Sequence, residues 1–155
     1  MCEEPELSLD RPMQPGQLLA RGVARALRAH AFTCLEEFVP ERGKRLDVMA
    51  LGPKGEFWVV ECKSSRADFA GDHKWEGYLP FADRFFWAVD CDFPTEILPE
   101  HTGLIIADAF GAEVIRMPAL TSINAARRRK LTLKFARDAA ARLHWSRDPM
   151  LAAAE

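Results

Sequence analysis

Apolar runs separated by turn signals predict the elements of this chain. Leu19, Val23 and Leu27 recur at every fourth position, which indicates an amphipathic helix over 16–30 with arginines on its outer face. Segments rich in aromatic and branched residues predict six strands, at 32–39, 45–51, 56–63, 84–89, 104–107 and 113–117. Two further helices are expected, over 67–78 and 124–145.

This order of elements predicts an α/β sandwich with a mixed central sheet flanked by helices. The 155 residues are enough for one hydrophobic core, and the chain shows no internal repeat. We therefore expect one domain over 16–147, a flexible tail at 1–15 and a C-terminal tail at 148–155. In the last helix, the expected apolar stripe consists of Leu131, Phe135, Ala139 and Leu143.

The net charge of −2 conceals a strong separation of charge along the chain. Residues 83–113 contain seven acidic residues and one arginine, whereas residues 116–147 contain nine lysines or arginines and one acidic residue. This distribution excludes a uniformly basic coat for nucleic acid. It predicts that a basic C-terminal helix contacts DNA and that the acidic 83–113 face meets a partner protein.

The sequence also predicts the compartment. It has no apolar run long enough to span a membrane, and its acidic, proline-rich N-terminus does not resemble a signal peptide. The four cysteines lie about thirty residues apart without a CxxC pair, which is typical of reduced, mostly buried thiols. We expect a cytoplasmic protein with no membrane partner.

Three charged residues interrupt two strands that are otherwise apolar. Asp47 lies in the strand 45–51, and Glu61 and Lys63 lie in the strand 56–63. If residues 52–56 form the hairpin loop, Asp47 is opposite Glu61, and like charges at that separation repel each other. Because a buried carboxylate needs a cation, this arrangement predicts a functional site.

A divalent cation between the two carboxylates would remove their repulsion. Oxygen ligands suit Mg²⁺ or Mn²⁺, with Asp47 and Glu61 as ligands and the backbone carbonyl of Cys62 as a further one. Lys63 would then orient or deprotonate a water, or stabilise charge on a phosphate, as phosphodiester hydrolysis requires. The structural alternative is a buried salt bridge of Lys63 with Asp47 or Glu61.

The D…ExK pattern on a strand–turn–strand unit resembles the PD-(D/E)XK nuclease superfamily. The wider run, from RLDVMAL through EFWVVECK to GAEVIR, resembles the MmcB family of bacterial DNA repair proteins within it. The resemblance implies a restriction-endonuclease-like sandwich with Asp47, Glu61 and Lys63 as catalytic residues. It also implies a further upstream acidic residue, for which Glu37 is preferred to Glu36 and is expected to face inward.

Contacts with DNA are expected from two places. Ser65, Lys74 and Tyr78 follow the lysine on the predicted second helix, although Ser65 is more often a helix cap. The C-terminal helix supplies the basic cluster, and its predicted contacts with phosphates are Arg127, Arg128, Lys130 and Lys134.

The sequence thus predicts a DNA repair protein that hydrolyses phosphodiester bonds of damaged or branched DNA with Mg²⁺ or Mn²⁺. Two alternatives stay open: a non-catalytic DNA-binding module that retains the nuclease fold, and a scaffold for other repair proteins. Enzymes of this superfamily often act as dimers, so a homodimer is also an option.

Overall fold

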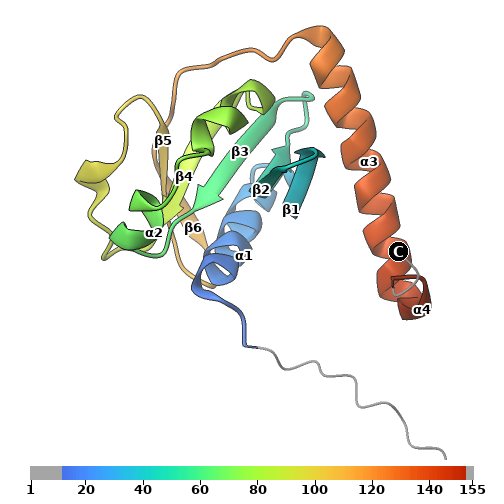
Figure 1. Cartoon of the computed structure of the whole chain (residues 1–155), viewed down its shortest axis with the longest axis horizontal. Coiled ribbons are helices and arrows are strands. Elements are labelled where there is room, and N and C mark those ends of the chain that lie inside the picture. The colour runs from blue at the N-terminus through green and yellow to red at the C-terminus, as the bar shows by residue number, and fades with distance from the viewer. Residues whose placement is uncertain (1–11, 153–155) are drawn as a thin grey trace, which may run out of the picture.

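Six strands form one mixed sheet, and helices cover both of its faces (Figure 1). The computed structural model describes residues 12–152. The strands are β1 (Thr33–Glu41), β2 (Lys44–Leu51), β3 (Phe57–Cys62), β4 (Arg84–Val89), β5 (Gly103–Ala107) and β6 (Ala112–Arg116). The helices are α1 (Pro15–Arg28), α2 (Arg66–Ala70), α3 (Ala125–Arg147), α4 (Pro149–Ala152) and the short 3₁₀ segments η1 (Trp75–Phe81) and η2 (Thr95–Ile97).

The spatial order of the strands follows the chain, β1-β2-β3-β4-β5-β6. Strands β1, β2 and β3 pair antiparallel, β3, β4 and β5 pair parallel, and β6 returns antiparallel to β5. The expected mixed α/β architecture is therefore confirmed. Because β3, β4 and β5 are parallel, the loops that follow them leave the sheet at the same edge.

The sheet separates two apolar cores. On one face, α1 buries Leu19, Val23 and Leu27, its predicted stripe, against β2 to β5. On the other face, Leu131 and Phe135 of α3 join a core with residues of β2, β3, β4 and η1. Strands β3 and β4 are covered on both faces, which explains their nearly continuous apolar sequences.

The predicted helix over 67–78 is wrong. The chain forms the single-turn helix α2, which ends at Gly71, and then the 3₁₀ segment η1, which contains Pro80. Proline cannot donate a helical hydrogen bond, and glycine commonly ends helices. Asp72 accepts backbone hydrogen bonds from Lys74 and Trp75, and so satisfies these donors without a continuous helix.

Helix α3 is as long as predicted, but its apolar stripe packs over only half of its length. Leu131 and Phe135 are buried, whereas Leu143 is 61% exposed. Past Phe135, the helix extends beyond the core that it covers (Figure 1).

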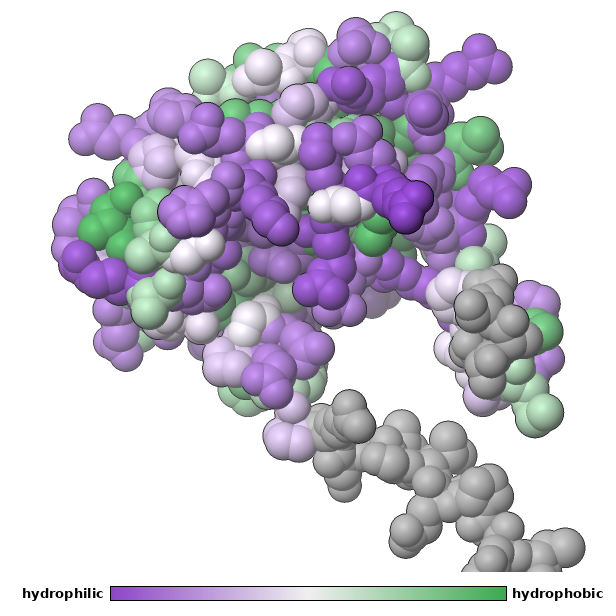
Figure 2. Space-filling view, viewed as in Figure 1, coloured by the Kyte–Doolittle hydropathy of each residue, from purple (hydrophilic) through white to green (hydrophobic). Residues whose placement is uncertain are grey.

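The face seen in Figure 2 carries mainly hydrophilic residues, with apolar side chains scattered among them.

Strand β1 has a kink at Glu37, whose backbone adopts a positive φ of 50°. Before the kink, Glu36 pairs with Val48, whose side chain belongs to the α1 core. After it, Phe38 pairs with Leu46, and both side chains belong to the α3 core. The Glu37 kink therefore turns the end of the β1–β2 hairpin toward α3, and Asp47 lies at the turning point.

Two smaller predictions concern compartment and tails. No helix within residues 12–152 is long and apolar enough to cross a membrane. Cys62 is buried and Cys34 half-buried, but Cys91 is exposed, so the expectation of mostly buried thiols is only partly met, and Cys2 lies outside the described residues. Most of the predicted N-terminal tail lies outside the described residues, and α4 occupies part of the predicted C-terminal tail.

Candidate functional site

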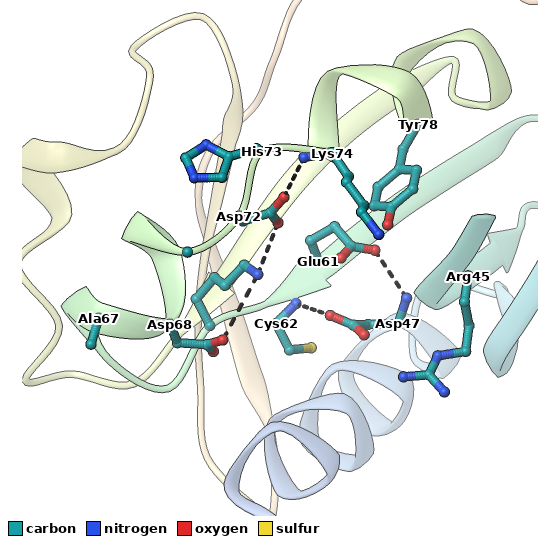
Figure 3. Close-up of a pocket in the computed structure, with 12 residues that line it drawn as sticks. Arg45, Asp47, Glu61, Cys62, Ala67, Asp68, Asp72, His73, Lys74 and Tyr78 are labelled. Carbon is teal, nitrogen blue, oxygen red and sulfur yellow. Dashed lines mark hydrogen bonds and ion pairs between the residues drawn. The ribbon is translucent and has the colours of Figure 1, made fainter. Parts of the chain in front are cut away.

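The β2–β3 pairing ends one residue before the two predicted metal-binding carboxylates. Leu51 pairs with Phe57, as predicted, and the last backbone pair is Val48 with Val60. Beyond it, side chains replace the backbone ladder: the amide of Asp47 donates to Glu61 Oε1 at 3.0 Å, and the amide of Cys62 donates to Asp47 Oδ2 at 2.8 Å. The expected juxtaposition of the carboxylates is therefore confirmed (Figure 3).

The carboxyl pair has no cationic partner in the part of the chain that the structure describes. Glu61 is only 4% exposed, and no lysine, arginine or histidine within residues 12–152 forms an ion pair with it or with Asp47. Burial and the adjacent charge of Asp47 raise the pKa of Glu61 to about 9. Burial also raises the pKa of Asp47. Glu61 therefore carries a proton at neutral pH, and the pair as a whole favours the arrival of positive charge.

Lys63 lies beside the carboxyl pair but is held by other residues. Its Nζ is 2.8 Å from Asp72 Oδ2 and 4.0 Å from Asp68 Oδ1. The structural alternative, a salt bridge of Lys63 with Asp47 or Glu61, is therefore not what the structure shows. Burial acts to lower the pKa of Lys63, but the hydrogen bond and charge of Asp72 outweigh it and raise that pKa. The side chain is an ammonium at neutral pH.

Asp72 is a site residue that sequence reasoning missed. One of its oxygens accepts the amides of Lys74 and Trp75 at 2.9 and 3.1 Å, and the other accepts Lys63. This arrangement fixes the direction of the ammonium. The signal in the sequence is an aspartate followed three residues later by the start of a helical segment, which is typical of an Asx turn.

These residues line an open cleft of about 580 Å³. Lys74 and Tyr78, two predicted contacts with DNA, lie on its wall opposite Asp47 (Figure 3). Burial and then the nearby carboxylates raise the pKa of Tyr78, which keeps its hydroxyl a donor. Arg45 and His73 also line the cleft and were not predicted as site residues. The cleft thus combines carboxylates with two ammonium groups, a guanidinium and a phenol.

Ser65 lies outside this cleft. Its hydroxyl accepts the amide of Asp68 at 3.0 Å and caps α2, the role that sequence reasoning favoured. In addition, Asp68 accepts the amide of Ser64. A contact of Ser65 with phosphate stays a prediction, and its position gives it a structural task in holding α2 beside Lys63.

Glu37 does not face inward as expected, because its side chain is exposed. The Glu37 kink places it, with the half-buried Glu36, around a separate hollow of about 250 Å³ that Asp47 and Cys62 also line. Arg142 of α3 donates to the carbonyl oxygens of Glu36 and Glu37 and holds the kink. The upstream carboxylate therefore lies near Asp47, on the α1 side of the site.

The donor set fits a hard divalent cation with few protein ligands. The thiol of Cys62 is buried in the α1 core, so only its backbone is available to the site, as predicted. Within residues 12–152, no group of three or more His, Cys, Asp or Glu side chains is placed to hold a metal ion. Two carboxylates with water in the remaining positions are the arrangement that Mg²⁺ commonly accepts.

The four predicted DNA contacts of α3 divide into two kinds. Lys130 is exposed, and Arg127 and Lys134 reach the surface while their cations lie over the rings of Phe81 and Phe38. Arg128, in contrast, forms a two-pronged ion pair with the buried Asp83 at 2.6 and 2.7 Å. Its guanidinium therefore has a structural task. Asp83 is likewise not part of a surface, which reduces the acidic 83–113 face.

The sheet and the cleft define a class: a mixed α/β protein with a carboxylate–lysine cleft where its parallel strands end. The sequence matches the family model "DNA repair protein MmcB-like" over residues 5–150, and the chain belongs to this family. It is similar to a solved structure, the SPO1766 protein of unknown function from Silicibacter pomeroyi. The two share 61% identity and a TM-score of 0.88, over 90% of this chain and 96% of that one. Among curated proteins, none matches.

Proposed function

We propose that this protein is a DNA repair nuclease of the PD-(D/E)XK type, which hydrolyses phosphodiester bonds with Mg²⁺ or Mn²⁺. The observation that carries the proposal is the opposed pair of the half-buried Asp47 and the buried Glu61, which has no ion-pair partner within residues 12–152 and lies beside a fixed ammonium. A chain that needed only stability would gain from replacing such a pair with apolar residues. Membership of a DNA repair family supports DNA as the substrate.

Asp47 and Glu61 would hold the cation, with the Cys62 carbonyl as the third predicted ligand. When bound, the cation would polarise a phosphate oxygen and lower the pKa of a water. The two carboxylates also bind each other's strands through backbone amides, so their positions are set before any ligand arrives. This preorganisation is what an electrostatic site requires.

Lys63 would stabilise negative charge on the phosphate or orient the attacking water. Its raised pKa argues against the predicted alternative in which it deprotonates that water, because an ammonium has no free lone pair. Asp72 acts as a positioning residue that aims the ammonium into the cleft. Lys74 and Tyr78 on the opposite wall would donate to neighbouring phosphate oxygens.

A non-catalytic DNA-binding module is the second candidate. One observation favours it: the ammonium of Lys63 is already paired with Asp72, which reduces its field at a phosphate. With Glu61 protonated, three carboxylates and three cations of the cleft cancel, so the cleft offers DNA no net attraction in the absence of a metal. Binding with no metal at all would therefore have to use α3 rather than the cleft.

The test is a cleavage assay on nicked, branched, flapped and single-stranded DNA in Mg²⁺ or Mn²⁺. We expect the unmodified protein to cleave at least one of these, and Asp47→Asn, Glu61→Gln and Lys63→Ala to lose about 100-fold or more of the rate. Glu113→Gln, an exposed carboxylate on β6, is the matched control. Cleavage that survives in all three variants contradicts the site, and binding without cleavage favours the module.

The basic side of α3 is tested by binding to duplex DNA without metal. Replacing Arg127, Lys130 and Lys134 with alanine should weaken binding and reduce the salt slope by about 0.9 for each lost phosphate contact. Lys54→Ala, which removes one exposed charge at the tip of the β2–β3 hairpin, is the control. An unchanged slope in the triple variant removes α3 from the DNA interface.

A further inference from the structure

Helix α1 carries a row of positive charges that the carboxylate cleft does not use. Between Pro15 and Arg28 it contains three arginines and no acidic residue. Arg25 and Arg28 are exposed, and Arg21 is half-buried. Their spacing of four and three residues places them on one helix face, about 6 and 4.5 Å apart along the axis.

An exposed aromatic ring lies beside this row. Phe110, at the tip of the β5–β6 turn, is 75% exposed, and the guanidinium carbon of Arg21 is 5.9 Å from its ring centroid. Arg21 also donates from Nε to the carbonyl oxygen of Ala109 at 2.9 Å. The arginine therefore connects the helix to the turn and leaves most of the ring open to solvent.

The turn that carries Phe110 is fixed in place. The carboxylate of Asp108 accepts the amides of Phe110 and Gly111 at 2.8 and 3.0 Å. The turn's backbone packs directly on α1, since a Cβ at Gly22 would lie 1.8 Å from the carbonyl oxygen of Asp108. A fixed backbone holds the apolar ring at a set place on the surface, so the turn loses little freedom on binding.

The turn with Phe110 lies at the sheet edge that holds the candidate site. Strands β3 and β5 are parallel and separated only by β4, so their ends are about 10 Å apart. Lys63 follows β3, and the turn with Phe110 follows β5.

The start of α1 also lies near the candidate site, since Gln14 and Gln17 line the hollow that Asp47 lines. From this edge α1 runs back across the sheet, since Phe32, which follows the helix, packs against Trp58 at the start of β3.

We infer that the β5–β6 turn and α1 bind a single-stranded segment of nucleic acid that starts beside the carboxylate cleft and continues along α1 away from it. Phosphates lie along Arg25 and Arg28, and an unpaired base stacks on the open face of Phe110. A stacking ring selects single strands, because the bases of a duplex already stack on each other. The inference deepens the proposed function, on which it rests, by assigning a substrate with an unpaired strand at the cut.

The test measures binding of a fluorescein-labelled oligothymidylate by anisotropy, in EDTA and with the whole chain. Phe110→Ala should weaken binding about fivefold or more, as the loss of one stacked base predicts. Phe110→Trp should retain the affinity. Ile115→Ala is the matched control, because Ile115 is also an exposed apolar residue, on the adjoining strand β6.

A strand of abasic nucleotides separates stacking from charge. It should bind the unmodified protein about as weakly as oligothymidylate binds Phe110→Ala, and the variant should lose nothing further on it. The double variant Arg25→Ala/Arg28→Ala should reduce the salt slope by about 1.4, at 0.7 for each phosphate contact of a single strand.

Three results would overturn the inference: no binding of oligothymidylate by the unmodified protein, equal affinity of Phe110→Ala, or an equal loss by this variant on the abasic strand. Because the assay contains neither metal nor cleavage, an inactive carboxylate site leaves its outcome unchanged. Conversely, a failure here leaves the metal-dependent cleavage test standing.

Discussion

Two buried carboxylates, Asp83 and Glu61, have opposite environments. Asp83 is 2% exposed and accepts four hydrogen bonds: the amides of Phe57 and Ile123 and two nitrogens of Arg128. Although burial acts to raise its pKa, the bonds from Arg128 and the two amides lower it. Glu61 is 4% exposed, accepts one amide and faces another carboxylate, and burial followed by the charge of Asp47 raises its pKa to about 9.

The difference separates a structural acid, Asp83, from the acid that we propose to be functional, Glu61. At the start of β4, Asp83 joins β3, the chain before α3 and α3 itself, and its charge is fully compensated. At the end of β3, Glu61 adds no comparable bonds and costs stability, because burial beside Asp47 opposes its ionisation. Folded proteins retain such a cost where chemistry needs it. We therefore predict that neutralising Asp83 lowers the free energy of unfolding, whereas neutralising Glu61 raises it.

The largest effect is expected at Asp83. Asp83→Ala should lower the free energy of unfolding by about 3–5 kcal/mol, because it removes the acceptor of two buried amides and leaves Arg128 without its partner. Urea denaturation at neutral pH measures this change. Asp108→Ala, whose carboxylate caps an exposed turn, is the control and should cost far less.

The pH dependence of the free energy of unfolding should show that Asp83 stabilises the protein in its ionised form. Since the pKa of Asp83 is lower in the folded protein than its ordinary 3.8, its contribution is present above that value and is lost as pH falls through the folded pKa. The stabilities of the unmodified protein and Asp83→Ala should therefore converge in acid. A loss below about 1 kcal/mol at neutral pH contradicts the structural role.

Glu61→Gln should act in the opposite direction and stabilise the protein by about 1–2 kcal/mol at neutral pH. The amide keeps an oxygen for the Asp47 N–H and removes the ionisation that burial opposes. Because the pKa of Glu61 is raised from 4.5 to about 9, the unmodified protein loses stability as pH rises between these values. The gain in stability should thus vanish near pH 4.5. Thermal melts across this pH range measure it. A Glu61→Gln variant that is less stable than the unmodified protein at neutral pH would contradict the prediction.

The sequence predicted the functional acid better than the structural one. Charged residues stand out in the apolar runs RLDVMAL and EFWVVECK, and a short turn between the strands fixes their register. The ion pair of Asp83 with Arg128 spans 45 residues and crosses between a strand and a helix. No local spacing relates such residues, so Arg128 was assigned to DNA instead.

Two local features also lay beyond sequence reasoning. The Glu37 kink needs a left-handed backbone at a residue that rarely adopts one, so alternation predicted an inward side chain where the structure exposes it. The segment after Lys63 has helical spacing but also contains Gly71 and Pro80, and in the structure these two residues prevent a continuous helix. As a result, the partnership of Asp72 with Lys63 was missed.

A smaller effect is expected where α3 holds the Glu37 kink. Arg142→Ala removes the donors to the carbonyls of Glu36 and Glu37 and should lower the free energy of unfolding by about 1–2 kcal/mol. Because Asp47 lies opposite the kink, the affinity for Mn²⁺ should fall as well. Arg137→Ala, exposed on the same helix, should change neither quantity, and equal effects of both variants would exclude a specific link.

The smallest effect concerns the strain at Glu37. Glu37→Gly should stabilise the protein by about 0.5–1 kcal/mol, because glycine adopts a φ of 50° without steric cost. If Glu37 is the upstream acidic residue of the site, the same change should weaken Mn²⁺ binding. Thermal melts with and without Mn²⁺ measure both. Stabilisation with unchanged Mn²⁺ affinity would leave Glu37 outside the metal site.

The central claim is that Asp47 and Glu61 form a divalent-metal site, and calorimetric titration with Mn²⁺ at neutral pH tests it most directly. The account predicts binding at one site per chain, with release of about one proton because Glu61 must ionise, which titrations in two buffers reveal. Asp47→Asn should abolish the heat, and Glu113→Gln should preserve it. Absence of binding to the unmodified protein, or equal binding to Asp47→Asn, would contradict the account.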